Sequence, residues 1–511
     1  MTTGPLIGAI DEGTSSARFI LFRAGTAEVV TSHQHSLSQI CPQEGWVEQD
    51  PMEILSVVNM CIEKTIEKLI AIGGNVSDIA AIGVTNQRES TVVWEKSTGK
   101  PLYNSIVWLD VRTSSTVDQL LEKIPNKTKN KNYLKPLCGL PISPYFSAVK
   151  VRWLIDNVQK VKKAIAANDC LFGTIDSWII WNLTGGPNGG LHLTDVTNAS
   201  RTMLMNIDSL KWDPVLLNFF GVPQAILPKI KSSSEIYGEI KDGPLKSLKL
   251  AGCVGDQQSA LLGQQCLQRG QAKATYGTGC FLLYNTGTIK VSSAHGLITT
   301  VAYQLGPKSQ PIYALEGSVA IAGAALNWLK DNMNLLPTFS DAQRIAEEAE
   351  LQDAGEVYFV PAFSGLYAPY WQQEARGVII GISEDTQSCH IVRATLDAVC
   401  FQTRDILEAM TKDYGSHLAS IQVDGGMTAN SLLMQLQADL AGIKVAKASM
   451  AESTALGAAM VAGAAVGLWD LTRPMDIPCE EWTPKLSDDE RDMRYSKWKL
   501  AVEKAMGWDV L

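Results

Sequence analysis

The stretch Ile7–Phe22 most constrains the fold, because in it two apolar runs flank a short polar turn. The pattern predicts a β-hairpin with a polar tip, since Gly13 lets the backbone turn tightly. Hydroxyl and N–H donors and one positive charge make the tip suitable for a phosphate group; they belong to Thr14, Ser15, Ser16 and Arg18. Asp11 lies beside the tip and suits a metal ion. For this stretch alone, an ordinary Gly-Thr-Ser turn is the alternative.

A second stretch of the same kind, Ala272–Asn285, opens the second half of the chain with an apolar run, a Gly-Thr turn and another apolar run. The 511 residues also exceed what one hydrophobic core usually serves. We therefore expect duplicated domains that face each other across a cleft, each beginning with a phosphate-type hairpin.

Charge, cysteine spacing and hydropathy exclude several classes of protein. The formal net charge is −9 and no Lys/Arg block occurs, which argues against a nucleic-acid partner. The 10 cysteines are scattered without a C-x-x-C pair, so we expect neither a zinc site nor a disulfide framework. No apolar run reaches the roughly 18 to 20 residues of a membrane span. These features predict a cytoplasmic protein without a membrane span.

Helix and strand signals alternate in the first half of the chain. Asp50, followed by a proline, predicts a helix start, with Glu53 placed to close a capping box. The apolar run Ile79–Asn86 predicts a buried strand, and the order of elements favours a mixed sheet with covering helices. Arg88 and Glu89 follow this strand directly, where α/β sheets commonly place ligand contacts; a solvated turn is the alternative.

Polar residues also follow strands in the second half. The predicted strand Lys249–Gly255 passes straight into a helix, and Asp256 is either the N-cap of that helix or a group with a chemical role. The turn formed by Asp424, Gly425 and Gly426 is a third candidate for phosphate or ribose. Residues 454–469 are rich in small side chains and predict close contact of a helix with its neighbours.

Two motifs carry a resemblance to a known family. Residues 145–154 (YFSAVKVRWL) fit one signature of the FGGY carbohydrate kinases, and Gly381-Ile382 followed by residues 390–397 (HIVRATLD) fits the other. Further segments resemble members of this family in the right order: GWVEQDP, TNQRE, TDVTNASRTM, GDQQ, TYGTGCF, YALEGSV, PAFSGL and VDGG. The resemblance covers essentially the whole chain and is closer in character to animal members than to bacterial ones.

The resemblance implies an α/β protein with two actin-like (ribonuclease-H-like) domains flanking a deep cleft. Residues 1–257 would form the N-terminal, polyol-binding domain and residues 258–511 the C-terminal, nucleotide-binding domain. The implied reaction is in-line transfer of the ATP γ-phosphoryl group to glycerol, with Mg²⁺ bound and Asp256 accepting the hydroxyl proton. A homo-oligomer, dimer or tetramer, is expected by resemblance alone.

The same resemblance assigns site residues. Hydrogen bonds to glycerol are assigned to Arg88, Glu89, Tyr145 and Asp256, contacts with its carbons to Trp108 and Phe281, and a neighbouring position to Gln257. Nucleotide contacts are assigned to Thr14, Ser15, Ser16, Arg18, Thr278, Gly323, Asn327, Gly426 and Asn430, and the place near magnesium to Asp11.

Some positions depart from the family pattern. Glu12 stands where the family usually has Gln, and a carboxylate there either weakens nucleotide binding by repulsion or is offset by magnesium or arginine. Asn327 replaces a Gln of bacterial relatives, and the stretch EIKDGPLKSLKL lacks the Gly-Gly-x-Arg loop of their regulatory site. A pentulose or gluconate kinase of the same family and a catalytically impaired actin-like paralogue are the alternative functions.

Overall fold

A computed structural model describes residues 4–125, 128–319, 321–349, 357–363, 365–372, 374–415 and 417–508. Contacts between Cα atoms divide the chain into two units. The first unit contains the chain up to Leu267 together with Thr299–Tyr313 and Glu452–Met475, and the second contains Gln268–Ile298, Ala314–Ala451 and the chain from Asp476 onward. The units therefore interleave along the sequence. The boundary expected after Gln257 stays a prediction.

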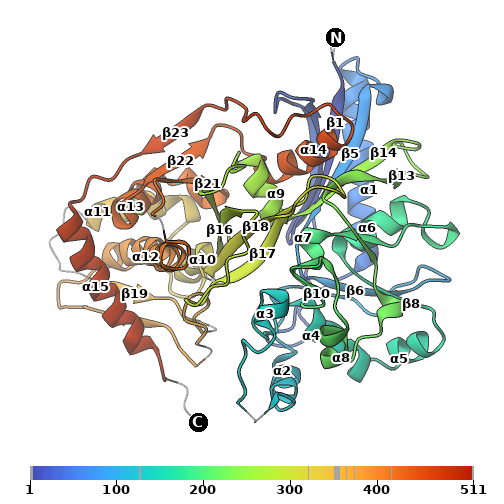
Figure 1. The fold of residues 1–511 in the computed structure, drawn as a ribbon. Coiled ribbons are helices and arrows are strands. Elements are labelled where there is room, and N and C mark those ends of the chain that lie inside the picture. Colours follow the sequence, from blue (N-terminus) through green and yellow to red (C-terminus); the bar gives the residue numbers. More distant parts are fainter. Residues whose placement is uncertain are drawn as a thin grey trace. The chain divides into compact units, whose positions relative to one another are not determined.

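The first unit is built on a six-stranded sheet with the strand order β13-β14-β5-β1-β2-β3 (Figure 1). Its strands are β1 (Leu6–Glu12), β2 (Ser16–Arg23), β3 (Val29–Ser36), β5 (Ile79–Asn86), β13 (Ser234–Glu239) and β14 (Lys249–Gly255). β1 and β2 form the predicted opening hairpin, and β5 runs parallel to both β1 and β14. Because β1, β5 and β14 are parallel, their carboxyl ends meet at one edge of the sheet. Glu12, Arg88 and Asp256 lie at or just beyond these ends.

Two helices pack on this sheet. α1 (Pro51–Ala71) contacts β2 and β3, whereas α14 (Ser453–Ala465) contacts β1, β5 and β14 (Figure 1). A Cβ atom at Gly83 of β5 would lie 2.1 Å from the carbonyl oxygen of Ala458, so the helix backbone approaches the strand as closely as glycine permits. A Cβ atom at Gly457 would lie 1.9 Å from the carbonyl oxygen of Ser259 in α9 (Asp256–Gly263). The predicted close contact of this small-residue helix is confirmed.

The start of α1 confirms one capping prediction and corrects another. The Asp50 side chain accepts a hydrogen bond from Met52 N at 2.8 Å and caps the helix, as predicted. Glu53 does not close a capping box. Its Oε1 accepts a hydrogen bond from Ser38 N at 3.1 Å instead, because a loop that is distant in sequence supplies the donor.

The rest of the first unit consists of smaller elements. A four-stranded sheet has the order β4-β7-β6-β8, with β4 (Glu48–Gln49), β6 (Thr91–Glu95), β7 (Ser105–Ile106) and β8 (Cys170–Thr174). Helices and short strands follow as α2 (Ser114–Leu121), α3 (Lys135–Cys138), α4 (Ser147–Asn157), α5 (Gln159–Ala166), α6 (Ile175–Leu183), β9 (Leu193–Asp195), α7 (Val196–Ala199), β10 (Met205–Asn206), β11 (Lys211–Trp212), α8 (Pro214–Phe220) and β12 (Lys229–Lys231). β17 (Ile298–Tyr303) and β18 (Ile312–Val319) cross the division between the units along the sequence.

The second unit repeats the strand arrangement of the first. Its strands follow the order β18-β16-β15-β21-β22-β23, with β15 (Ala272–Tyr276), β16 (Cys280–Gly287), β21 (Ser420–Asp424), β22 (Lys444–Ala448) and β23 (Cys479–Trp482). β15 and β16 are an antiparallel hairpin, and β21 runs parallel to both β15 and β22. This is the relation that β1, β2, β5 and β14 have in the first unit. The internal repeat predicted from the two hairpins is therefore confirmed.

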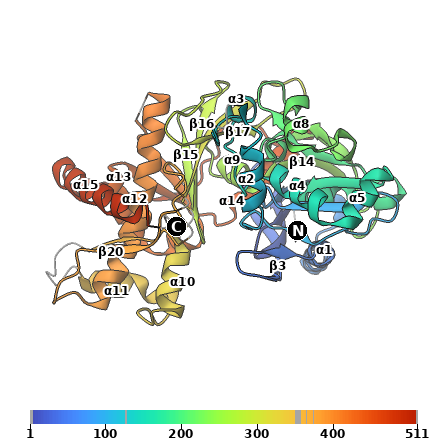
Figure 2. The same ribbon diagram turned by 90° about the horizontal axis from the view of Figure 1, so that it is seen from below.

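Helices complete the second unit: α10 (Gly323–Asp331), α11 (Ala342–Glu348), α12 (Ser388–Tyr414), α13 (Ser431–Ala441) and α15 (Asp488–Ala505), with the short pair β19 (Tyr358–Val360) and β20 (Val378–Ile380). The long α12 packs against α13, which in turn contacts α15 (Figure 2). Phe401 of α12 stacks on Trp498 of α15 with ring centroids 5.3 Å apart. Among the described helices, none has both the length and the apolar character needed to cross a membrane.

Candidate active site

The opening hairpin presents the predicted phosphate-binding residues in a tight turn. Gly13 N donates to Ser16 O at 2.9 Å, so Thr14 and Ser15 form the tip between β1 and β2. Arg18 lies opposite Asp11 in the hairpin register, with 3.4 Å between Arg18 Nε and Asp11 Oδ2. The structure therefore brings together the five residues predicted to bind phosphate or metal: Asp11, Thr14, Ser15, Ser16 and Arg18.

Asp11 lies in an environment with an excess of negative charge. Burial raises the pKa of Asp11 to about 6, although Arg18 acts in the opposite direction, and the carboxylates of Glu452 and Asp256 raise it further. Arg18 does not neutralise Asp11 alone, because it also pairs with Glu452: its Nη1 lies 2.8 Å from Glu452 Oε2. A cation near Asp11 would relieve this excess of charge.

Glu12 is fully buried at the end of β1. Its Oε1 accepts a hydrogen bond from Gln87 Nε2 at 2.8 Å. Burial raises the pKa of Glu12 well above its usual 4.5, although the hydrogen bonds from Gln87 lower it. Burial thus favours the neutral acid, which presents one acceptor to Gln87 much as a glutamine amide would. Burial therefore acts against the charged form, and with it against repulsion of a triphosphate.

Arg88 and Glu89 form a buried pair of charges beyond β5, with exposed fractions of 2% and 1%. Arg88 Nε lies 3.3 Å from Asp256 Oδ1 and 3.9 Å from Glu89 Oε1. Glu89 has φ = 56°, a region that residues other than glycine rarely occupy, and such strain is often found at functional sites. Its carbonyl oxygen accepts hydrogen bonds from Thr91 Oγ1 and Ser147 Oγ, both at 3.0 Å. The solvated turn, which was the alternative for this stretch, is thereby excluded.

Asp256 differs in position from the helix cap that the sequence predicts. It is the first residue of α9, and Gly255 is the N-cap, with no side-chain capping bond. Asp256 Oδ1 instead accepts a hydrogen bond from its neighbour Gln257 N at 2.7 Å. The carboxylate therefore lies at the positive end of the helix dipole and faces Arg88.

Two aromatic rings adjoin these charges. Trp108 and Tyr145 are in edge contact, with ring centroids 5.6 Å apart. Arg201 lies over the Tyr145 ring at 5.7 Å, and its Nε is 2.5 Å from Glu89 Oε1. In this part of the first unit, charged side chains and aromatic rings are therefore direct neighbours.

Lys150 supports Tyr145 from the interior. Its side chain is fully buried in α4, and Nζ donates to the carbonyl oxygens of Pro144 and Tyr145 at 2.7 and 2.6 Å. Burial lowers the pKa of Lys150 to about 7, although Glu89 and Asp110 act in the opposite direction.

The second hairpin brings predicted nucleotide residues together in the second unit. The β15–β16 turn contains Thr278, whose carbonyl oxygen accepts hydrogen bonds from Ala322 N and Ala324 N at 3.0 and 3.1 Å. Gly323 N donates to Gly277 O at 3.0 Å, and a Cβ atom on Gly323 would lie 2.7 Å from that oxygen. The start of α10 therefore packs directly on the turn.

The remaining predicted residues of the second unit lie on nearby elements of the fold. Asn327 is exposed on α10, one turn beyond the first residues of that helix, and Phe281 is half-buried on β16. Gly426 follows β21, and Asn430 caps α13 by accepting a hydrogen bond from Leu433 N at 2.9 Å. The roles assigned to these residues stay predictions.

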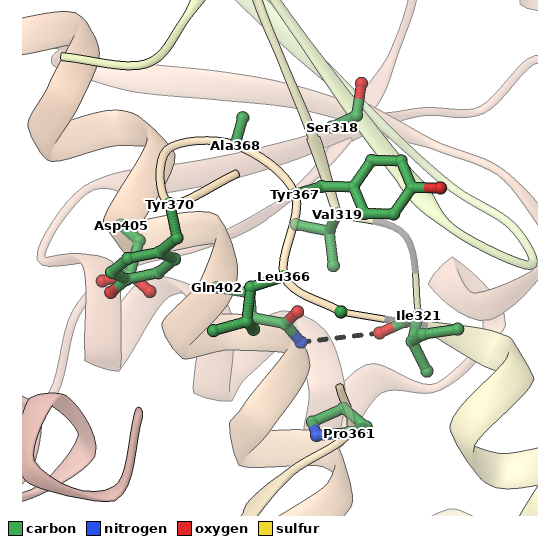
Figure 3. Close-up of a pocket in the computed structure, with 11 residues that line it drawn as sticks. Ser318, Val319, Ile321, Pro361, Leu366, Tyr367, Ala368, Tyr370, Gln402 and Asp405 are labelled. Atoms are coloured by element: carbon green, nitrogen blue, oxygen red, sulfur yellow. Dashed lines mark hydrogen bonds between the residues drawn. The ribbon is translucent and has the colours of Figure 1, made fainter. Parts of the chain in front are cut away.

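Hollows within the described residues lie away from the predicted site residues, and two of them illustrate this. One, in the second unit, has a volume of about 10 Å³, space for a single water, beside Tyr367, Gln402 and Asp405 (Figure 3). The other, in the first unit, is open and has a volume of about 650 Å³, with Lys211 and Trp212 in its lining. Neither is lined by a residue that the sequence assigns to a ligand.

Sequence reasoning missed three residues that shape the site. Arg201 binds Glu89 from 112 positions away, and Glu452 binds Arg18 from 434 positions away. Glu452 carries no local signal, and Arg201 lies in a segment, TDVTNASRTM, that resembles the family but does not reveal its partner. Lys150 lies inside a quoted family signature, but only its burial against two carbonyl groups shows what it contacts.

Comparisons with known proteins agree with this arrangement. Residues 6–263 match a model of the FGGY family of carbohydrate kinases, N-terminal domain, and residues 272–466 match the C-terminal domain of that family. A glycerol kinase of Arabidopsis thaliana is 50% identical over 98% of this chain and 97% of its own length. A probable glycerol kinase of Dictyostelium discoideum is 48% identical, with 99% of each chain covered.

Solved structures are similar over the same extent. The crystal structure of Plasmodium falciparum glycerol kinase with ADP is 38% identical, has a TM-score of 0.88 and covers 98% of each chain. A xylulose kinase from Lactobacillus acidophilus is 23% identical with a TM-score of 0.81, covers 98% of this chain and 97% of its own, and shows the fold alone. The predicted α/β fold with two domains is confirmed.

Proposed function

Because the chain belongs to the FGGY family of carbohydrate kinases, we propose that it catalyses the ATP-dependent phosphorylation of glycerol to sn-glycerol 3-phosphate. The observation that carries this proposal is the cluster of Arg88, Glu89 and Asp256, with Trp108 and Tyr145 beside it. The relatives named glycerol kinase, at 48% and 50% identity over nearly their full length, support the choice of substrate.

The chemistry of the cluster suits a small triol. Glycerol has three hydroxyl groups on a short carbon chain, so its recognition needs charged donors and acceptors together with apolar walls. Arg88 and the hydroxyl group of Tyr145 supply donors, and Glu89 and Asp256 supply acceptors. The ring of Trp108 supplies an apolar face. Arg201 holds the Glu89 carboxylate in place and thereby fixes the direction of its acceptors.

In the proposed reaction, Asp256 accepts the proton of the hydroxyl group that attacks the γ-phosphorus. The bond between the γ-phosphorus and the bridging oxygen of ATP breaks as the new P–O bond forms, and ADP leaves with the electron pair. The transition state of such transfers is loose, so positioning and electrostatic stabilisation supply most of the acceleration. Arg88, 3.3 Å from Asp256 Oδ1, orients the base.

The nucleotide side of the proposal rests on the two hairpins. Thr14, Ser15 and Ser16 supply donors for phosphate oxygens in the first unit, and family resemblance assigns the same role to Thr278 in the second. Asp11 fits a magnesium ion, because its carboxylate is a hard oxygen ligand among an excess of acidic groups. When bound, Mg²⁺ neutralises charge on the phosphate oxygens.

Location and assembly are part of the proposal. None of the 10 cysteines, all of which lie within the described residues, forms a disulfide, which supports a reducing compartment such as the cytoplasm. A homo-oligomer is proposed from family resemblance, and sedimentation of the purified chain tests it.

A coupled assay of ADP release tests the function. Purified protein with ATP is given glycerol, other polyols, pentuloses or gluconate, and turnover is expected with glycerol. Asp256→Asn should lose most turnover yet still bind glycerol and ATP, whereas Asp242→Asn, which changes an exposed acid, should not. Preference for a pentulose or gluconate would replace the proposed substrate. Glycerol binding without any turnover would support the impaired paralogue.

A further inference from the structure

A closed ring of hydrogen bonds joins the turn at Thr14 to Trp108. Gln87 Nε2 donates to Gln49 Oε1 at 2.8 Å, and Gln49 Nε2 donates to Thr14 O at 2.9 Å. Trp108 Nε1 donates to Thr14 Oγ1 at 2.9 Å, and Trp108 N donates to Ser90 Oγ at 3.0 Å. Ser90 Oγ donates to Gln87 Oε1 at 2.8 Å and closes the ring.

Three members of the ring lie in the protein interior, whereas Thr14 and Trp108 are half-buried. Gln87 and Ser90 are fully buried, and Gln49 is 1% exposed. The second proton of Gln87 Nε2 goes to Glu12 Oε1 at 2.8 Å, so both amide protons have acceptors. Among the three buried side chains, a hydrogen bond that is lost leaves its partner unsatisfied.

Trp108 is held at two points by this ring. The Ser90 hydroxyl fixes its backbone, and the Thr14 hydroxyl fixes its indole. The hydroxyl of Ser177 in α6 is also buried, but it has no hydrogen-bond partner among the described residues. Burial of a serine in this unit therefore does not by itself produce such bonds.

The two ends of the ring belong to different ligands of the proposed function. Trp108 is assigned to the carbon chain of glycerol, and Thr14 is assigned to the phosphate groups of the nucleotide. A ligand that immobilises the indole also removes freedom from the Thr14 turn, because the two groups share a hydrogen bond.

We propose that Gln49, Gln87 and Ser90 are positioning residues that couple the two substrate sites, so that glycerol bound against Trp108 raises nucleotide affinity at the Thr14 turn. The coupling is reciprocal: bound nucleotide raises glycerol affinity by the same factor. This inference rests on the proposed function. It requires no contact between the three residues and either substrate.

Calorimetric titration of ADP, with and without saturating glycerol, measures the coupling directly. In the unaltered protein, glycerol should lower the Kd for ADP. Ser90→Ala removes the hydroxyl group that hydrogen-bonds both Gln87 and Trp108. The variant should reduce the effect of glycerol on the Kd for ADP. In steady-state kinetics it should also raise the KM for glycerol by roughly five- to tenfold. Ser90→Thr keeps the hydroxyl and should restore both values. Ser177→Ala removes a buried hydroxyl without a partner and is the matched control.

A second variant keeps the test decisive if Ser90→Ala is poorly folded. Gln49→Met preserves side-chain length but removes the donor to Thr14 O, and it should also abolish the effect of glycerol on ADP binding. Thermal unfolding of every variant identifies losses that reflect stability alone. If the unaltered protein phosphorylates glycerol but Ser90→Ala and Gln49→Met couple the ligands as it does, the inference is wrong and the function stands. If the unaltered protein has no kinase activity, the proposed function fails first.

Discussion

Lys150 is a buried cation whose replacement by methionine should change how the stability of the protein depends on pH. Burial lowers the pKa of Lys150 from 10.5 to about 7. Between these values the unfolded chain holds a proton that the native state does not, so this group makes the native state more stable as the pH rises. The contribution is fully present above 10.5 and is lost as the pH falls through about 7.

The size of the effect follows from the two pKa values. Each pKa unit corresponds to about 1.4 kcal/mol, so the difference between 10.5 and about 7 corresponds to about 5 kcal/mol over the whole interval. Lys150→Met removes this pH dependence, and it also removes the donors to Pro144 O and Tyr145 O. The free energy of unfolding of the native sequence, minus that of the variant, should therefore rise by about 1.4 kcal/mol per pH unit above pH 7.

Urea unfolding followed by tryptophan fluorescence, at several values from pH 6 to 9.5, measures this difference. Lys162→Met, which changes an exposed lysine on the neighbouring α5, provides the matched control and should show no such slope. A difference that stays flat across the range for Lys150→Met would refute the reasoning. It would mean that the ammonium group stays charged in the native state and that the carbonyl oxygens of Pro144 and Tyr145 offset its burial.

Three further substitutions have expected outcomes. Burial raises the pKa of Glu12, so its contribution to stability is lost as the pH rises above 4.5, and Glu12→Gln should gain stability over the native sequence by up to about 1.4 kcal/mol per pH unit there, in urea unfolding. The same variant should change the KM for ATP less than twofold; a large decrease would show that Glu12 is charged. Gly457→Ala places a Cβ atom 1.9 Å from Ser259 O, and the Tm should fall by several degrees; an unchanged Tm would show that α14 moves freely. Arg201→Lys cannot keep both the contact with Glu89 and the stacking on an aromatic ring, so steady-state kinetics should show a glycerol KM raised about tenfold and an unchanged KM for ATP.

The elements that the sequence predicts well carry their signals locally. Both hairpins combine a glycine turn with two apolar strands, and the strands that precede Arg88 and Asp256 are continuous apolar runs. Such patterns need no knowledge of tertiary contacts. The strands, and the positions of polar residues at their ends, could therefore be predicted.

The partners of these residues could not be predicted in the same way. Glu89 meets Arg201, and Arg18 meets Glu452, only because the fold brings distant segments together. The wrong capping box has the same cause, since the donor to Glu53 comes from a loop outside the helix. A carboxylate next to a phosphate-binding turn also looks exposed to solvent in sequence, and only the structure shows that Glu12 is completely buried.

The return of Glu452–Met475 to the first unit has a consequence for how the protein is made. A ribosome releases β1, β5 and β14 long before it has synthesised α14, the helix that covers them. Until then, the apolar surface beneath that helix is open to solvent and to chaperones. The first unit therefore cannot finish folding until nearly the whole chain has been synthesised. A fragment that ends at Gln257 lacks α14, the helix that packs on its sheet.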